Sequence, residues 1–387
     1  MAKMEVATKV GATRITPARW ALYATLTLAA VGLPIMFQAL NNVFMVHIFG
    51  LMGIYVMLAL GLNIVVGYAG LLDLGYIAFY AMGAYSGVIL GSVGMQIAGK
   101  GFGPWAYWAL LPVAAVVAAG TGIALGTPVL RLKGDYLAIV TLGFGEIVRI
   151  IATNWSQLTN GPAGLPRAAQ FVPSPAGQQW ASDHLSRGNF QFSADLWWYY
   201  VIGALCLVTV FFVRRLDNSR LGRAWVAMRE DMVAAASVGI NITTTKLWAF
   251  SLGALWGGIG GITYGYWVGF ISPESFNFFE SVLIVCMVVL GGMGSIPGAA
   301  LGAVIIAGLP EIIRGLAQSR ALSGVLTVDQ AAAIGNYRYL IFGLLMVVMM
   351  AVRPQGILPS SRRARELHPE DEAILEEESA EITSASM

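Results

Sequence analysis

The sequence predicts an all-α fold, a polytopic membrane helix bundle. Hydrophobic residues make up 57% of the 387 residues and charged residues only 11%, with a mean hydropathy of +0.71. Several apolar runs reach the ~20 residues that a helix needs to cross the hydrocarbon layer. The runs are continuous and do not alternate with a period of two, so helices satisfy the buried backbone better than a β-barrel would.

Nine apolar runs are expected to supply nine or ten transmembrane elements. The eighth run is interrupted by glycines and a proline between Gly291 and Gly298, which favours two shorter elements there. A similar glycine-rich break at Gly67–Gly70 precedes the third run, and broken helices in two duplicated halves are typical of transport proteins. The runs are Trp20–Leu40, Val43–Val66, Leu71–Leu90, Ala106–Leu130, Tyr136–Ala152, Leu196–Val213, Leu247–Ile271, Val282–Leu309 and Tyr337–Val352.

Basic residues orient these elements across the membrane. Residues 1–19 carry four Lys and Arg side chains, which predicts a cytoplasmic amino-terminal segment followed by an uncleaved first span. Counting crossings places residues 153–195 outside and the charged segment 214–246 inside. Ten elements within the membrane domain, residues 20–359, also bring the carboxyl terminus inside. The acidic residues 360–387 are expected to form a disordered cytoplasmic tail.

The chain lacks the residue patterns of an enzyme or of a nucleic-acid-binding protein. Its two cysteines lie in apolar runs, its three histidines are scattered, and its net charge of +2 is spread over loops. Gly94–Gly101 nearly spells a phosphate-binding loop, but Gly101 stands where that motif needs Ser or Thr. We expect no metal and no cofactor bound by this chain. The cysteines and histidines are Cys206, Cys286, His47, His184 and His368.

The segment 214–246 contains an apolar stripe at helical spacing. Leu221, Trp225, Met228, Met232 and then Ala235 or Ala236 recur at intervals of three and four residues, which predicts one amphipathic helix. Such a helix can lie on the membrane surface, pack beneath its own bundle or insert into a partner's groove. On the other face lie Arg223, Glu230 and Asp231, and Gly239 is expected to end the helix.

The end of this segment resembles the loop through which ABC-importer permeases contact their ATPases. That motif has two alanines and, four residues after the second, a glycine, as in Ala234, Ala235 and Gly239. Val233 stands where the motif has a glutamate. Further motifs resemble the permeases of branched-chain amino-acid importers of the LivH/LivM family, in the family's order, from about Val43 to Pro359. They are Leu72–Tyr80, Arg131–Ile147, Leu158–Pro162, Gly291–Gly298 and Arg353–Gly356.

This resemblance implies a permease subunit in the inner membrane of a bacterium. Its partners would be a sister permease subunit, two cytoplasmic ATPase subunits that bind the ATP, and an external substrate-binding protein. The importer would translocate branched-chain or other hydrophobic amino acids. The residues expected to contact an ATPase are Leu221, Trp225, Met228, Arg229, Glu230, Asp231, Ala234, Ala235 and Gly239.

Four polar residues are candidates for the translocation pathway: Asp73, Tyr76, Thr141 and Glu146. Intramembrane carboxylates are costly and usually face a cavity or a partner. Glu146 could instead pair with Arg149, three residues on, and Asp73 could cap a helix starting at Leu74 or contact a substrate ammonium group. Many family members have Gln-x-Ser-x-Gly-His where this chain has Leu71 to Tyr76, so the roles of those polar groups do not transfer.

Five glycines recur at every fourth position along the seventh run. Small residues at this spacing form a groove that another helix can approach closely, so we expect a helix-packing face. The neighbouring helix could belong to this chain or to a sister subunit. The glycines are Gly253, Gly257, Gly261, Gly265 and Gly269.

The sequence also allows other transport functions. Permeases for urea or short amides resemble the same family, and measured uptake of leucine and urea separates the two cargoes. A proton-coupled secondary transporter could use Asp73 and Glu146 as a relay, and would not need an ATPase. A passive channel would need no segment of the kind found at 214–246.

Overall fold

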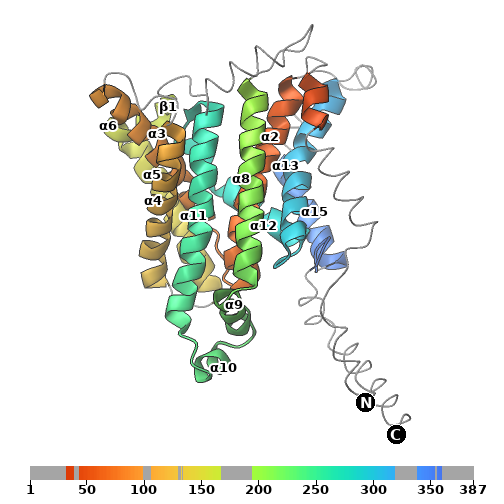
Figure 1. The fold of residues 1–387 in the computed structure, drawn as a ribbon. Coiled ribbons are helices and arrows are strands. Elements are labelled where there is room, and N and C mark those ends of the chain that lie inside the picture. The colour runs from red at the N-terminus through yellow and green to blue at the C-terminus, as the bar shows by residue number, and fades with distance from the viewer. Residues whose placement is uncertain are drawn as a thin grey trace, which may run out of the picture.

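The computed structural model describes residues 32–38, 43–98, 106–129, 132, 134–166, 194–318, 338–353 and 355–359, and these form a bundle of mostly upright helices (Figure 1). The all-α prediction is therefore confirmed. Five helices are long and apolar enough to cross a membrane: Phe44–Tyr68, Ala106–Val129, Asp135–Asn154, Ala194–Asp217 and Pro273–Gly291. Of the first expected span, Trp20–Leu40, only residues 32–38 are described, and they are helical.

The elements follow one another in a simple order along the chain. They are α2 (Val43–Asn63), the π-helix η2 (Ile64–Tyr68), α3 (Tyr76–Ala98), α4 (Ala106–Val129), α5 (Asp135–Asn154), α6 (Ser156–Thr159), η4 (Gly161–Ala163), β1 (Leu165–Pro166), α8 (Ala194–Asp217), α9 (Arg220–Glu230), α10 (Met232–Ser237), α11 (Ile242–Val268), β2 (Phe270–Ile271), η5 (Pro273–Phe276), α12 (Phe278–Gly291), α13 (Ile296–Gln318) and α15 (Arg338–Val352).

Helix α11 lies at the centre of the bundle, against α2, α3 and α4. Its glycines let these neighbours approach closely, because a Cβ atom at Gly261 would collide with the Tyr80 carbonyl oxygen of α3. Gly253, Gly257 and Gly265 likewise face residues of η2, α2 and α3. Four of the five glycines thus face close neighbours within this chain.

The fifth glycine, Gly269, has a different role. Helix α11 ends at Val268, and Gly269 takes a φ of 79°, the left-handed conformation of a helix C-cap. Its assignment to the packing face was wrong, because the helix ends before the glycine period does. The expected span Leu247–Ile271 accordingly becomes Ile242–Val268.

Two glycine-rich breaks lie against each other in the bundle. The expected split of Val282–Leu309 is confirmed, since α12 ends at Gly291 and α13 begins at Ile296. In the other break the chain is not helical from Leu71 to Gly75, so the expected helix start at Leu71 is wrong. The two breaks touch where an added Cβ atom at Gly67 would lie 2.5 Å from the Gly294 amide nitrogen, and the Asn63 side-chain oxygen, at the end of α2, accepts a hydrogen bond of 2.8 Å from that amide. Duplication of the two halves remains a prediction.

The two ends of the bundle carry different small elements (Figure 1). At one end, β1 pairs in antiparallel fashion with β2, with Leu165 opposite Ile271. Here α6, η4 and β1 occupy the described start of the expected external segment 153–195. Helices α9 and α10 lie at the opposite end.

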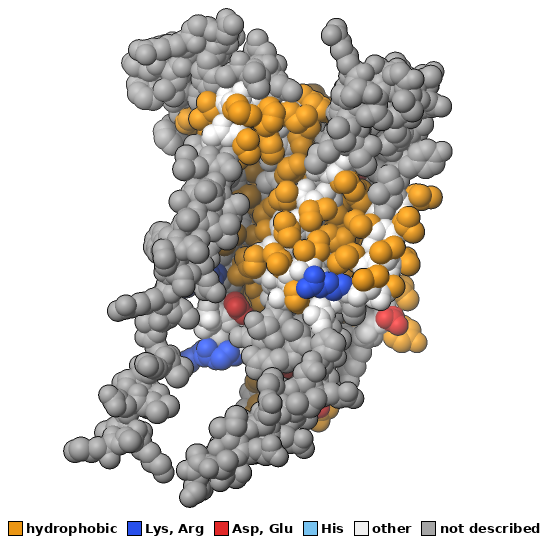
Figure 2. Space-filling view, turned by 90° about the vertical axis from the view of Figure 1, so that its right-hand side faces the viewer, with side chains coloured by type: hydrophobic (Ala, Val, Ile, Leu, Met, Phe, Trp, Pro, Cys, Tyr) orange, Lys and Arg blue, Asp and Glu red, His pale blue; other side chains and the backbone are white. Residues whose placement is uncertain are grey.

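The side of the bundle is apolar. Figure 2 shows hydrophobic side chains over much of the described surface of one lateral face, with few charged groups among them. Val116, Leu207 and Leu340 are 69%, 72% and 65% exposed on α4, α8 and α15. Exposed apolar side chains on several lateral helices are what contact with lipid requires.

Candidate functional site

A pair of short helices projects from one end of the bundle. Ser219 accepts a hydrogen bond from the amide of Gly222 and so caps α9. After α9, Asp231 adopts an extended conformation, with φ −150° and ψ 115°, and its carboxylate accepts hydrogen bonds from the amides of Val233 at 2.7 Å and Ala234 at 3.0 Å. The single amphipathic helix was therefore a wrong prediction: Asp231 ends one helix and caps the next, although the apolar stripe continues past it.

The first of these helices, α9, packs beneath its own bundle. Trp225 and Met228 are fully buried, and the Trp225 indole donates a hydrogen bond of 2.8 Å to the Thr245 carbonyl at the start of α11. Arg229 donates a hydrogen bond of 2.7 Å to the Gly67 carbonyl in η2. Of the three placements that the sequence left open, burial under the bundle is the one found for α9.

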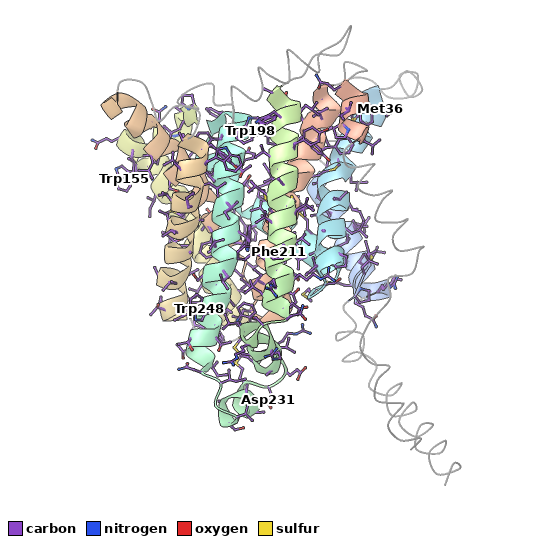
Figure 3. All side chains as sticks on the ribbon, viewed as in Figure 1. Met36, Trp155, Trp198, Phe211, Asp231 and Trp248 are labelled. Atoms are coloured by element: carbon purple, nitrogen blue, oxygen red, sulfur yellow. The ribbon has the colours of Figure 1, made fainter. Side chains whose placement is uncertain are left out.

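The second helix, α10, extends away from the bundle, and Figure 3 shows Asp231 near the far end of this projection. Val233 and Val238 are 78% and 76% exposed, while Ala235 is buried. Gly239 has a φ of 89°, and the amide of Ile240 donates a hydrogen bond of 3.1 Å back to the Ala235 carbonyl, so the prediction that Gly239 ends this helix is confirmed. Helix α10 is thus a small convex element, ordered at both ends by its own chain, with apolar side chains facing outward.

The predicted ATPase-contact residues divide into three groups by exposure. Glu230, Asp231, Ala234 and Gly239 are exposed, Leu221 and Arg229 are half-buried, and Trp225, Met228 and Ala235 are buried against this chain. The hydrogen bonds from Ala234 and Val233 lower the pKa of the Asp231 carboxyl below its ordinary value, because they favour the ionised form. Only the exposed group is placed to touch another protein.

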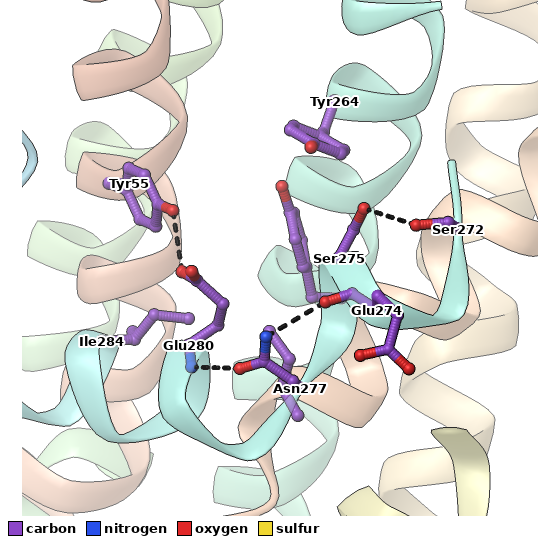
Figure 4. Close-up of a pocket in the computed structure, with 10 residues that line it drawn as sticks. Tyr55, Tyr264, Ser272, Glu274, Ser275, Asn277, Glu280 and Ile284 are labelled. Atoms are coloured by element: carbon purple, nitrogen blue, oxygen red, sulfur yellow. Dashed lines mark hydrogen bonds between the residues drawn. The ribbon is translucent and has the colours of Figure 1, made fainter. Parts of the chain in front are cut away.

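A polar cavity of about 300 Å³ lies within the bundle, between α2, α3, α11, η5 and α12 (Figure 4). Its volume is at the lower end of the range of small-molecule sites. Three tyrosines, two carboxylates, two serines, an amide and two isoleucines face it. The lining residues are Tyr55, Ile77, Tyr80, Tyr264, Ser272, Glu274, Ser275, Asn277, Glu280 and Ile284.

The start of α12 positions the carboxylate of Glu280 in this cavity. The Asn277 side chain caps α12 by accepting a hydrogen bond of 3.1 Å from the Glu280 amide. The Tyr55 hydroxyl then donates a hydrogen bond of 2.9 Å to the Glu280 carboxylate from α2. The Ser272 and Ser275 hydroxyls are 3.2 Å apart, and Figure 4 shows them away from Glu280.

Three of the four predicted pathway residues lie together around the first break. The Asp73 carboxylate accepts a hydrogen bond of 2.9 Å from the Gly75 amide, and the Thr141 hydroxyl accepts one of 3.1 Å from the Leu74 amide. The Tyr76 hydroxyl donates to the Gly253 carbonyl at 3.1 Å. Helix α3 starts at Tyr76, so Asp73 stabilises the turn before it and does not cap a helix at Leu74. None of these residues lines the cavity, and their part in a pathway remains a prediction.

The fourth predicted pathway residue, Glu146, takes part in an ion-pair chain. Arg149 lies 2.9 Å from the Glu146 carboxylate and 3.2 Å from that of Glu274. The alternative of a pair with Arg149 is confirmed, and Arg149 extends it to a residue that lines the cavity. Sequence reasoning missed Glu280, although a carboxylate directly before the apolar run at Val282 was a usable signal.

In the described part of the chain, no group of three or more His, Cys, Asp or Glu side chains is placed to hold a metal ion. Cys206 donates a hydrogen bond to the Gly53 carbonyl at 3.1 Å, and Cys286 is buried in α12. Both act as packing groups in these positions.

The sequence matches known transport proteins over most of its length. Residues 44–350 match the family described as "Branched-chain amino acid transport system / permease component". The high-affinity branched-chain amino acid transport system permease protein LivM of Salmonella typhimurium is 41% identical over 322 residues, covering 80% of this chain and 68% of that protein. The LivM protein of Escherichia coli shows the same identity and coverage. The LivH permease protein of Escherichia coli is 26% identical over 313 residues, covering 79% of this chain and 91% of LivH. No solved structure matches the chain.

Proposed function

The chain belongs to the family of branched-chain amino acid transport permease components, and from that membership we propose that it is one transmembrane subunit of an ATP-binding-cassette importer for branched-chain and other hydrophobic amino acids. Members of this family are transport permeases and not enzymes. The chain's own part is to form the path across the membrane, which agrees with its apolar helices.

The proposed assembly contains a sister permease, two cytoplasmic ATPase subunits and an external substrate-binding protein. ATP would be bound by the ATPase subunits, and this chain would hold no cofactor. The complex would lie in a bacterial inner membrane with both termini of this chain in the cytoplasm. This orientation puts the β1–β2 end outside and α10 inside.

The projection of α10 is the observation that carries this proposal. Its exposed Val233 and Val238 lie on a short helix that Asp231 starts and Gly239 ends, so its shape is set before any partner arrives. A preformed convex helix suits docking in a groove of another protein. Closure of the ATPases would push on α10, and α9 would carry the movement to η2 through the hydrogen bond from Arg229 to Gly67.

Reconstitution tests the proposal. The chain, its sister permease and the two ATPases are placed in proteoliposomes with ATP inside, and the binding protein and labelled leucine are added outside. We expect leucine uptake that requires ATP and the binding protein and that a protonophore leaves unchanged. Uptake of urea without leucine would instead identify a short-amide importer. Uptake that persists without the ATPases and stops with a protonophore would identify a secondary transporter.

A further inference from the structure

The cavity beside α12 is lined by both polar and apolar side chains. Glu280 and Tyr55 lie on the same side, joined by their hydrogen bond of 2.9 Å, and Figure 4 shows Ile284 next to them. The Ile77 side chain of α3 also lines the space. A ligand that fits must therefore combine a group that a carboxylate attracts with a compact hydrocarbon group.

The charges of the lining favour a cationic group on that ligand. Among the described residues that line the cavity there are two carboxylates and no Lys, Arg or His. Arg149 offsets the charge of Glu274 at 3.2 Å, and the side chain of Glu274 is 75% exposed. Glu280 is the deeper carboxylate. Its carboxylate accepts the hydrogen bond of 2.9 Å from the Tyr55 hydroxyl and carries the negative charge that attracts a cation.

Aromatic rings strengthen the preference for a cation. The Tyr80 and Tyr264 rings that line the cavity have centroids 5.5 Å apart, and Phe276 packs behind Tyr80 at 5.2 Å. The face of an aromatic ring attracts an ammonium group within about 6 Å of its centroid. The Ser272 and Ser275 hydroxyls, away from Glu280, share one hydrogen bond, and the hydroxyl that accepts it keeps its own proton to donate to an anionic group beside the ammonium group of the ligand.

We propose that this cavity is a binding site for the transported amino acid within the membrane domain, in which Glu280 and Tyr55 hold the ammonium group, Ser272 and Ser275 the carboxylate, and Ile77 and Ile284 the aliphatic side chain. The inference rests on the proposed function and adds to it a site in this chain. The permease then contributes to cargo selection and does not only open and close.

The test uses the reconstituted importer with the variant Glu280→Gln, which keeps the shape of the side chain and removes its charge. We expect leucine uptake to fall by about tenfold or more, the effect of losing one charge-assisted hydrogen bond. ATP hydrolysis stimulated by the binding protein shows that the variant complex is assembled. Asp195→Asn is the matched control, because Asp195 is a part-exposed carboxylate beside His47, outside the cavity.

A second variant, Ile284→Phe, tests the apolar part of the lining and leaves the charge of Glu280 in place. The larger ring should narrow the cavity and lower uptake of leucine at least threefold more than uptake of valine. The ratio of leucine uptake to valine uptake is measured in the same preparation, so it does not depend on how much of the variant folds. It therefore tests the binding site even if Glu280→Gln does not assemble.

The results that would contradict the binding site differ from those that would contradict the proposed importer function. Wild-type uptake of leucine, with unchanged uptake by Glu280→Gln and an unchanged leucine-to-valine ratio for Ile284→Phe, would overturn the site and leave the proposed function standing. A wild-type complex that imports no amino acid would overturn both.

Discussion

The guanidinium of Arg229 donates a hydrogen bond of 2.7 Å to the carbonyl of Gly67, a residue 162 positions earlier in the chain. This contact joins α9 to the end of the π-helix η2, where the first break begins. Gly70, in the same break, lies so close that an added Cβ atom would sit 2.6 Å from the Arg229 side chain. The projection at the end of the bundle and the broken segment inside it are thus in direct contact.

Replacing Arg229 by Gln should separate ATP hydrolysis from transport. The shorter neutral side chain cannot make the charge-assisted hydrogen bond to Gly67, which is worth about 1.5–3 kcal/mol. We expect uptake of leucine by the reconstituted importer to fall about tenfold or more while ATP hydrolysis continues. Both rates are measured in the same proteoliposomes.

The control for this variant is Arg223→Gln. Arg223 is an exposed residue of the same helix, and its side chain donates to the nearby Asn218 carbonyl, at 3.2 Å, and not to η2. Equal loss of uptake in the two variants would show that uptake depends on the positive charge of α9. The hydrogen bond from Arg229 to Gly67 would then have no special role.

Replacing Gly239 by Val should disturb the end of α10. The φ of 89° at Gly239 is a genuine outlier for a β-branched residue, with a cost of roughly 1–2 kcal/mol, although no other atom lies within 4 Å of an added Cβ. We expect severalfold lower uptake at unchanged amounts of protein in the membrane. Gly239→Asn is the control, because Asn tolerates this conformation, and it should transport normally. Normal uptake by the Val variant would contradict a docking role for this end of α10.

Acidic pH should release the cap of α10. The pKa of Asp231 is lowered by the amides of Ala234 and Val233, so the cap stabilises the helix above the unfolded carboxyl pKa of about 3.9 and is lost as the pH falls through the lower folded value. Hydrogen exchange of these two amides, corrected for its intrinsic pH dependence, should therefore speed up below about pH 4. In Asp231→Asn the side-chain oxygen still caps, and the protection should not change over that range. Equal loss of amide protection in the wild type and in Asp231→Asn would rule out protonation of the carboxylate as the cause.

Replacing Gly261 by Ala should destabilise the centre of the bundle. The new methyl group would collide with backbone atoms of Tyr80 and Ala84 in α3, and overpacking of this kind costs about 1–3 kcal/mol. Gly203→Ala in α8 is the matched control, with no atom within 4 Å of the added Cβ, and a gain of up to about 1 kcal/mol in helix propensity. Thermal unfolding in detergent measures both. Equal changes in melting temperature for Gly261→Ala and Gly203→Ala would mean that α11 can move away from α3 at little cost in free energy.

Features that depend on local backbone chemistry were predictable from the sequence. The break between α12 and α13 follows from glycines that take positive φ, at Gly292 and Gly294, and the end of α10 from Gly239. The bend at Asp231 was not predicted, since the apolar stripe of Leu221 to Ala235 continues through it. A capping aspartate decides the helix start there, and the periodic pattern does not.

Features that depend on distant contacts were not predictable in the same way. Tyr55 and Glu280 are 225 residues apart and meet only because α2 packs against α12. The Tyr76 hydroxyl likewise donates to the carbonyl of Gly253, 177 residues away, and the missing side chain of Gly253 leaves that carbonyl accessible. A single sequence holds no record of such pairs.

The two-residue pairing of β1 with β2 connects the wall of the cavity to the segment that follows α5. Ile271, opposite Leu165, is followed at once by Ser272 and η5, which form part of the cavity wall. A protein that pulls on residues 165–166 from outside would therefore shift this wall directly, while the contact of Arg229 with Gly67 acts from the other end of the bundle. In the proposed importer, the cavity wall would then respond to a docked binding protein through β1 and β2, at the end of the bundle opposite the contact of Arg229 with Gly67.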